Sequence, residues 1–274
     1  MKKCKTIAIV NQKGGVGKTT TTENLGIGLA MQGKKTLCVD ADAQGDLTAC
    51  LGWVNQDDLQ TTLSTLMGKV MQDLPISPHE GILHHKEGVD LLPGNIELSS
   101  MEMGLVNAMS REATLRNCLA EARQEYEYLL IDCPPSLGML TINALAASDS
   151  VIIPVQAQYL PAKGMTQLIQ TIGRVKKHIN PNLKIGGILI TLADNRTNLA
   201  KNTVQTIKAG YGKQIKIFDT QIPVSVKAAE MSSTGQSIFS YDPKGKAAEA
   251  YTKFTLEVLD CARQRAKLHD SHVR

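Results

Sequence analysis

The chain has 274 residues, of which 42% are hydrophobic, 20% are charged and 4% are aromatic, with a formal net charge of +4. This length accommodates one large α/β domain with a substantial core. So few aromatic rings argue against a platform on which single-stranded nucleic acid stacks its bases, and the mild positive charge permits contact with nucleic acid or an anionic membrane without requiring either.

Short β-branched, apolar runs alternate along the chain with segments of helical periodicity. Buried strands are expected at 6–11, 36–42, 89–93, 128–134, 150–156 and 185–192. Helices are expected at 18–32, 97–108, 111–125, 139–147, 162–179 and 198–209. This alternation predicts an α/β fold with a doubly wound, mostly parallel sheet flanked by helices. Ligands of such sheets bind at the carboxyl ends of the strands.

Two further segments complete the expected organisation. We expect a helical insertion over residues 54–88. Its first part, DDLQTTLSTLMGKV, precedes a proline-containing stretch. Apolar residues at 247, 250, 251, 254, 258, 261 and 262 form a helical stripe, so a helix over 244–267 should pack on the sheet. We expect residues 1–274 to form a single domain.

A glycine-rich loop lies between the first predicted strand and the first predicted helix, with the sequence QKGGVGKTT. Its glycines allow successive backbone N–H groups to surround phosphate oxygens, and the following helix presents its N-terminus to the same anion. Lys18 adds a positive charge, and the Thr19 hydroxyl is placed to ligate Mg²⁺. Gln12 stands where the usual GxxxxGK[ST] pattern has its first glycine. The residues expected to bind nucleotide here are Lys13, Gly14, Gly15, Val16, Gly17, Lys18, Thr19 and Thr20.

Acidic residues follow two of the predicted strands. Asp132 comes after four apolar residues, in the position of a Walker B carboxylate that holds Mg²⁺ through water. Asp40 and Asp42 are two residues apart, and on a strand both side chains would face the same side. One could support the metal while the other orients water. The alternative interpretation of all three is a polar strand end with turn chemistry.

The stretches KGGVGKTT, VDADAQGDLT and LLIDCPPSLG together resemble the deviant Walker A class of P-loop NTPases, and most closely the ParA/Soj-type partition ATPases. Four further stretches resemble the same family in the same order, so the resemblance covers nearly the whole chain. They are LPGNIELSSMEM, PVQAQYLPAKGMTQL, GILITLADNRTNLA and QIPVSVKAAEM. The resemblance implies an ATPase with ATP and Mg²⁺ as cofactors.

The resemblance also implies roles for individual residues. Lys13 matches the family's signature lysine, which reaches the phosphates bound by the other subunit of a nucleotide-sandwich homodimer. Lys18 and Thr19 match the loop lysine and the Mg²⁺ ligand. Asp42 matches the carboxylate that positions the attacking water. The residues that match acidic groups around the metal are Asp40 and Asp132, and those that match positions flanking the adenine are Leu192 and Pro223.

The function implied is a molecular switch whose ATP-bound dimer binds double-stranded DNA without sequence preference. With a ParB-type centromere-binding partner it would drive partition of plasmid, mobile-element or chromosomal DNA, in the cytoplasm and on the nucleoid when ATP-bound. Val224 stands where relatives often carry arginine, which weakens the resemblance at that surface. The candidate DNA contacts are Arg196, Lys227, Arg263 and Arg265, for which a solvated helix face is the alternative.

Two other functions remain as alternatives. A membrane-positioned ATPase of the MinD type needs an amphipathic C-terminus with bulky apolar residues, whereas this chain ends RQRAKLHDSHVR. An iron–sulfur reductase component needs cysteines that bridge a cluster across a dimer, and neither Cys118 nor Cys133 is suitably placed. The six scattered cysteines and the lack of a stretch of roughly 20 apolar residues favour a soluble cytoplasmic protein without membrane contact.

Overall fold

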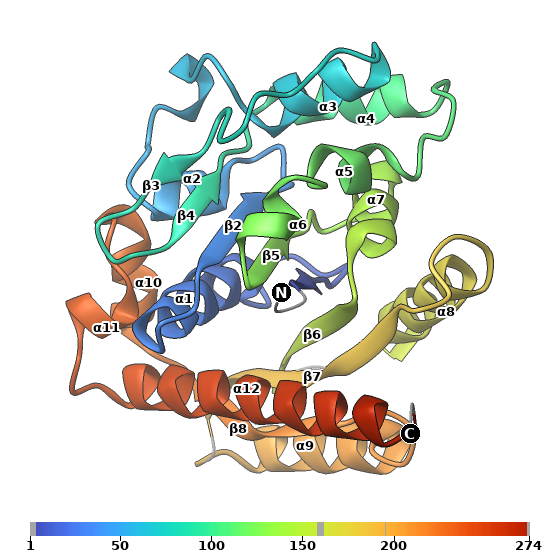
Figure 1. Cartoon of the computed structure of the whole chain (residues 1–274). Helices are drawn as coiled ribbons and strands as arrows, with labels where there is room; N and C mark the ends of the chain where they lie inside the picture. The colour runs from blue at the N-terminus through green and yellow to red at the C-terminus, as the bar shows by residue number, and fades with distance from the viewer. Residues whose placement is uncertain (1–3, 158–161, 195, 273–274) are drawn as a thin grey trace.

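The fold is built on one β-sheet. The computed structural model describes residues 4–157, 162–194 and 196–272, without the side chains of 162, 163 and 263–272. Within these residues the sheet has eight strands in the order β3-β4-β2-β5-β1-β6-β7-β8 (Figure 1). All neighbouring strands are parallel except β3 and β4. The strands are β1 (Lys5–Ile9), β2 (Thr36–Asp40), β3 (Leu83–His84), β4 (Asp90–Leu92), β5 (Tyr128–Asp132), β6 (Ser150–Gln156), β7 (Lys184–Ala193) and β8 (Ile217–Pro223).

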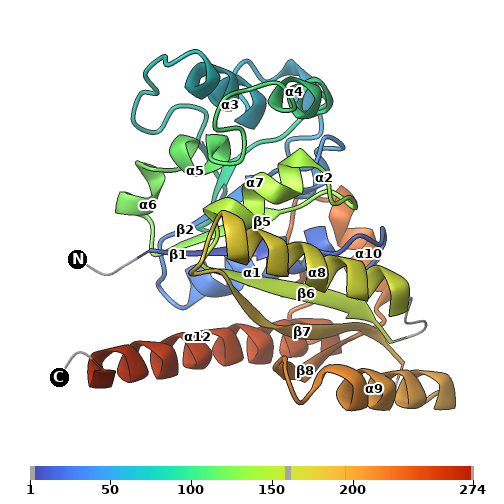
Figure 2. The ribbon, with the colours of Figure 1, turned by 90° about the vertical axis from the view of Figure 1, so that its right-hand side faces the viewer.

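Helices cover both faces of the sheet and enclose two separate apolar cores. The first core joins the sheet to α3, α4, α5, α7, α8 and α9, and the second joins it to α1, α2, α11 and α12. Figure 2 shows α7 and α8 on one side of β1 and β6, and α12 on the other. The α-helices are α1 (Lys18–Met31), α2 (Asp46–Cys50), α3 (Leu63–Met71), α4 (Glu97–Leu105), α5 (Thr114–Cys118), α6 (Ala122–Glu125), α7 (Met139–Ala147), α8 (Ala162–His178), α9 (Asn198–Tyr211), α10 (Val226–Glu230), α11 (Ile238–Tyr241) and α12 (Lys246–His272).

The predicted doubly wound α/β sheet is confirmed, and the differences lie in short elements. The sequence patterns did not predict β3 and β8, which form the two edges of the sheet. The segment 54–88 is only partly helical, because α3 is followed by β3, which pairs antiparallel with β4. The single helix predicted over 111–125 is wrong. The chain forms α5 and α6 there, with a break at residues 119–121.

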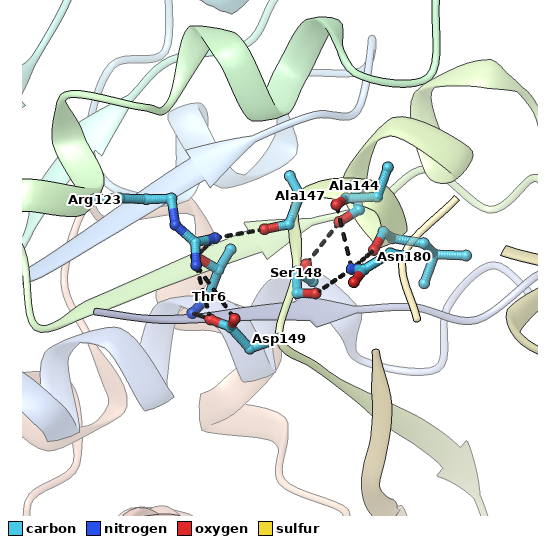
Figure 3. A network of polar contacts seen from close by, with 9 residues as sticks. Thr6, Arg123, Ala144, Ala147, Ser148, Asp149 and Asn180 are labelled. Carbon is cyan, nitrogen blue, oxygen red and sulfur yellow. Dashed lines mark hydrogen bonds and ion pairs between the residues drawn. The ribbon is translucent and has the colours of Figure 1, made fainter. Parts of the chain in front are cut away.

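Arg123 anchors α6 to the amino edge of the sheet. Its guanidinium donates to the Thr6 hydroxyl at 2.8 Å, to the Ala147 carbonyl at 2.7 Å and to both carboxylate oxygens of Asp149 at 3.2 Å. Asp149 also accepts from the Thr6 backbone N–H. Figure 3 shows these groups gathered beside Asn180, whose amide donates to the Ser148 carbonyl. The network joins α6, β1 and the start of β6 at the amino edge of the sheet.

Glu23 on α1 is a buried acid. Its side chain is 1% exposed, and neither carboxylate oxygen has a hydrogen-bond donor among the described residues. Burial holds the pKa of Glu23 well above its usual value, and the nearby Glu87 carboxylate raises it further. An ionised carboxylate there would lack both water and a donor, so the protonated form is the one that the folded state favours.

We expect Glu23→Gln to increase the free energy of unfolding at neutral pH. The folded-state pKa lies above the value of about 4.3 for an unfolded glutamate. The bound proton therefore makes its full contribution to the stability of the folded state below the unfolded-state pKa. This contribution is lost as the pH rises toward the folded-state pKa. Between about pH 5 and about pH 8, urea titrations should show the advantage of the variant growing, by at most about 1.4 kcal/mol per pH unit.

The control is Glu121→Gln, which neutralises an exposed glutamate. Its effect should be small and should not grow with pH. An advantage of Glu23→Gln that stayed constant over the whole range would contradict a buried proton at this position.

Candidate nucleotide-binding site

The glycine loop joins β1 to α1 and is fixed by its carbonyl groups. The Gln156 amide donates to the Gly15 carbonyl at 2.6 Å, and the Thr191 hydroxyl donates to the Val16 carbonyl at 2.9 Å. Gly15 and Gly17 have positive φ angles of 68° and 81°, which side chains disfavour. In a trans peptide the N–H points opposite to the carbonyl. The N–H groups of Val16 and Gly17 therefore point away from the strands, as phosphate binding requires.

Lys18 begins α1 and lies inside the loop. Its side chain is 7% exposed, and its ammonium lies 3.5 Å from the carbonyl oxygen of Lys13. The first N–H groups of α1 have no partner within the helix and make this end partially positive. A buried ammonium and a helix N-terminus thus meet at one point, which is an environment for a multiply charged anion.

Lys13 lies on the outer side of the loop, against β6. Its backbone N–H donates to the Asn11 side chain at 3.0 Å, and the Asn11 amide donates to the Pro154 carbonyl at 2.6 Å. The Lys13 ammonium donates to Gln156 Oε1 at 2.9 Å. Backbone and side chain of Lys13 are therefore both held at the carboxyl end of β6.

Asp132 ends β5 beside the loop and is completely buried. One oxygen accepts from the Thr22 hydroxyl at 3.4 Å, and Oδ2 has no partner among the described residues. Burial raises the pKa of Asp132 well above its usual value and the Asp40 carboxylate raises it further, while the nearby Thr19 hydroxyl and the charge of Lys18 lower it. A buried oxygen without a donor, beside a threonine hydroxyl, fits a site for Mg²⁺ and its water ligands.

Asp40 and Asp42 are arranged differently from the sequence-based expectation. β2 ends at Asp40, so the two residues do not lie on one strand. Asp40 accepts from the Thr48 N–H at 2.8 Å, from the Thr48 hydroxyl at 2.7 Å and from the Asp42 N–H at 3.2 Å. Burial raises the pKa of Asp40 to about 6 against these hydrogen bonds. The role of Asp40 at the metal stays a prediction, because both of its oxygens already have donors within the chain.

Asp42 lies in the loop after β2 and faces the charge of Lys18. Burial raises its pKa, while the Gln44 N–H, 3.1 Å from its carboxylate, and the Lys18 ammonium lower it. Asp42 is 9% exposed, so it combines restricted solvent access with a nearby positive charge. This is an environment in which one ordered water could be oriented.

Leu192 and Pro223 come together at the carboxyl edge of the sheet. Pro223 pairs with Ala193, the residue after Leu192, in the β7–β8 register. Leu192 has a φ angle of +48°, which is uncommon for a bulky residue and marks an irregularity at the end of β7. The two residues predicted to flank an adenine are therefore neighbours, close to Thr191 and hence to the loop.

The four candidate DNA contacts do not form one patch. Arg196 follows β7 and pairs with Asp194 at 2.9 Å, and Lys227 on α10 pairs with Asp242 at 2.9 Å. Lys216, just before β8, contacts Cys261, so α12 runs back toward the amino edge of the sheet. Figure 2 accordingly shows the end of α12 on the opposite side from α10. Arg263 and Arg265 are near that end, and their side chains lie outside the described residues.

Sequence reasoning missed the residues that hold the loop and the aspartates in place. Gln156 and Thr191 anchor two loop carbonyls, and Thr48 bridges Asp40 to the Gly94 N–H at 3.0 Å. A Cβ on Gly94 would lie 2.5 Å from the Asp40 carbonyl oxygen, so the close approach requires glycine. Gln156 and Thr191 stand at the carboxyl ends of predicted strands, which was the available signal.

The chain is similar to several known proteins over most of its length. A family model described as an AAA domain matches residues 4–185. The sporulation initiation inhibitor protein Soj of Bacillus subtilis is 43% identical over 254 residues, covering 93% of this chain and 98% of that protein. A cobyrinic acid a,c-diamide synthase structure from Mycobacterium smegmatis, with bound ATP analogue and magnesium, has a TM-score of 0.80 and 35% identity and covers 92% of each chain. The septum site-determining protein MinD from Pyrococcus horikoshii, complexed with Mg-ADP, has a TM-score of 0.69 and 26% identity over 93% of this chain and 96% of that one.

One related observation concerns membranes. In the part of the chain that the structure describes, no helix combines the length and the apolar character needed to cross a bilayer.

We expect Thr48→Val to destabilise the edge of the sheet that carries Asp40. Valine keeps the shape of threonine but removes the hydroxyl, so Asp40 loses a donor and the Gly94 N–H loses its acceptor. Leaving such buried groups unpaired should lower the free energy of unfolding by about 2 to 3 kcal/mol, measured by urea denaturation. Thr48→Ser keeps the hydroxyl and should cost about 1 kcal/mol for the lost methyl group. Equal losses in the two variants would contradict the bridging role.

Proposed function

The chain belongs to the ParA/Soj family of partition ATPases, and on that premise we propose that it is an ATP-hydrolysing switch whose ATP-bound homodimer binds DNA without sequence preference. The observation that carries the proposal is the pair of lysines around the glycine loop. Lys18 is buried within the loop, whereas the Lys13 side chain lies outside it against β6. Lys18 already supplies one buried ammonium to the loop, and we assign the outer lysine to the phosphates of a second subunit.

Nucleotide binding follows from the loop. The N–H groups of Val16 and Gly17, the start of α1 and Lys18 would hold the phosphates of ATP, and Leu192 and Pro223 would flank its adenine. Magnesium, when bound, neutralises negative charge on the phosphates. Thr19 would hold it directly and Asp132 through water, which would give the unpartnered Asp132 Oδ2 a hydrogen-bond donor.

Hydrolysis would depend on Asp42 and Lys13. Burial raises the pKa of Asp42, while the Gln44 N–H and the Lys18 charge oppose that rise and favour the ionised carboxylate that would orient an attacking water. Lys13 would add positive charge at the phosphates of the other subunit, where negative charge builds up during phosphoryl transfer. Hydrolysis would thus require the dimer and would also end it, so the bound nucleotide would set the assembly state.

DNA binding would come from cations at the carboxyl edge, since Arg196 and Lys227 both lie there. A dimer doubles the number of phosphate contacts, and because contacts add in free energy the affinity rises steeply. A centromere-binding partner of the ParB type would stimulate hydrolysis and release the dimer. The cargo would be plasmid, mobile-element or chromosomal DNA.

We expect DNA binding only with ATP or a non-hydrolysable ATP analogue, and not with ADP. A DNA mobility assay on unrelated duplexes should give similar affinities, which fall by about two orders of magnitude between roughly 50 and 200 mM salt for some four phosphate contacts. Lys13→Ala should abolish ATP-dependent binding. Asp42→Ala should bind DNA with ATP and stay bound, because ATP is not consumed.

Binding that is equal with every nucleotide, or absent with all of them, would overturn the switch. A parallel assay with anionic liposomes addresses the membrane-positioned alternative. ATP-dependent binding to liposomes without binding to DNA would favour that alternative and contradict this proposal.

A further inference from the structure

Gln156 ties Lys13 to the glycine loop of its own subunit. This residue ends β6, and its single amide group makes two contacts with the loop. Oε1 accepts from the Lys13 ammonium at 2.9 Å, and Nε2 donates to the Gly15 carbonyl at 2.6 Å. The orientation of the amide is forced, since an ammonium can only donate and a carbonyl can only accept. Reversing the amide would break both hydrogen bonds together.

This arrangement holds the Lys13 ammonium against its own subunit. The backbone of Lys13 is held as well, through Asn11 to the Pro154 carbonyl. The carboxyl end of β6 thus fixes both the root and the tip of the side chain. Extending the ammonium away from this chain requires the bond to Gln156 to break, while the backbone anchor can stay in place.

We propose that Gln156 is a positioning residue that holds Lys13 on its own subunit in the monomer and releases it when a nucleotide-loaded partner docks. This inference rests on the proposed function, because it assigns a resting place to a lysine that acts across a dimer. The hydrogen bond from the ammonium to a neutral amide is weaker than one to a phosphate. The exchange of partners is therefore favourable only when the phosphates of a second subunit are within reach.

The side chain at 156 would then act on dimerisation through Lys13 and on loop structure through Gly15. Two substitutions separate these effects. Gln156→Leu removes both hydrogen bonds. Gln156→Glu keeps an acceptor for Lys13, strengthened by charge, but faces the Gly15 carbonyl with a second acceptor. The holding role predicts opposite effects of the two variants on dimer formation, whereas a purely structural role through Gly15 predicts the same effect.

The first experiment measures how readily Lys13 is modified in the ADP-bound monomer, using reductive methylation read by mass spectrometry. Gln156→Leu should increase the modification rate of Lys13 several-fold, and Gln156→Glu should not. The matched control is Thr191→Val, which removes the other loop anchor without touching Lys13. An unchanged rate in Gln156→Leu, or the same increase in Thr191→Val, would overturn the proposal.

The second experiment measures dimer formation with a non-hydrolysable ATP analogue by sedimentation. Gln156→Leu should lower the dimer dissociation constant about tenfold, equivalent to about 1.4 kcal/mol, since hydrogen bonds to charged groups contribute at least this much. Gln156→Glu should raise it. In a Lys13→Ala background, Gln156→Leu should no longer lower the dimer dissociation constant and Gln156→Glu should no longer raise it. Weaker dimers in both variants, or a Gln156→Leu effect that persists without Lys13, would contradict the holding role.

The two experiments distinguish failure of this inference from failure of the proposed function. If the wild-type chain does not dimerise with any nucleotide, the proposed switch is wrong. The methylation result alone then decides whether Gln156 holds Lys13.

Discussion

The electrostatic balance around Lys18 is the constraint on which the carboxyl edge of the sheet depends. The parallel register places Asp40 directly beside Asp132 across β2 and β5, and both carboxyl groups are completely buried. Burial raises the pKa of both groups, and the Asp40 carboxylate raises that of Asp132 further. The buried Lys18 ammonium opposes this effect at Asp132 and Asp42. Lys18 thus offsets part of the repulsion among the aspartates at this edge.

Side chains at the same edge hold the glycine loop through its carbonyl groups. Gln156 and Thr191 are paired in the β6–β7 register, so the two donors that hold the loop come from adjacent strands. Because trans peptides oppose N–H and carbonyl, fixing the carbonyls on the strand side orients the N–H groups toward the phosphate side. The phosphate-binding surface of the loop is therefore set by β6 and β7, which follow it by more than a hundred residues.

The sequence predicted the alternating fold and the loop because both depend on local patterns. Apolar runs such as 150–156 match β6 to the residue, and Lys18 begins α1 as expected. Short elements escaped prediction because they are too brief for a periodic pattern. The four residues of α6 are held by the ion pair of Arg123 with Asp149, and the two residues of β3 by pairing with β4. The contact between Lys13 and Gln156 spans 143 positions, so no local pattern encodes it.

The placement of the surface cations limits how DNA could be bound under the proposed function. Arg196 and Lys227 already pair with Asp194 and Asp242, and these exposed pairs contribute little stability. A DNA phosphate would replace one carboxylate partner with another anion, so each single contact gains little free energy. The end of α12 lies at the opposite edge, away from this surface (Figure 2). Useful affinity must then come from repeating weak contacts across a dimer, which is why control of Lys13 would also control DNA binding.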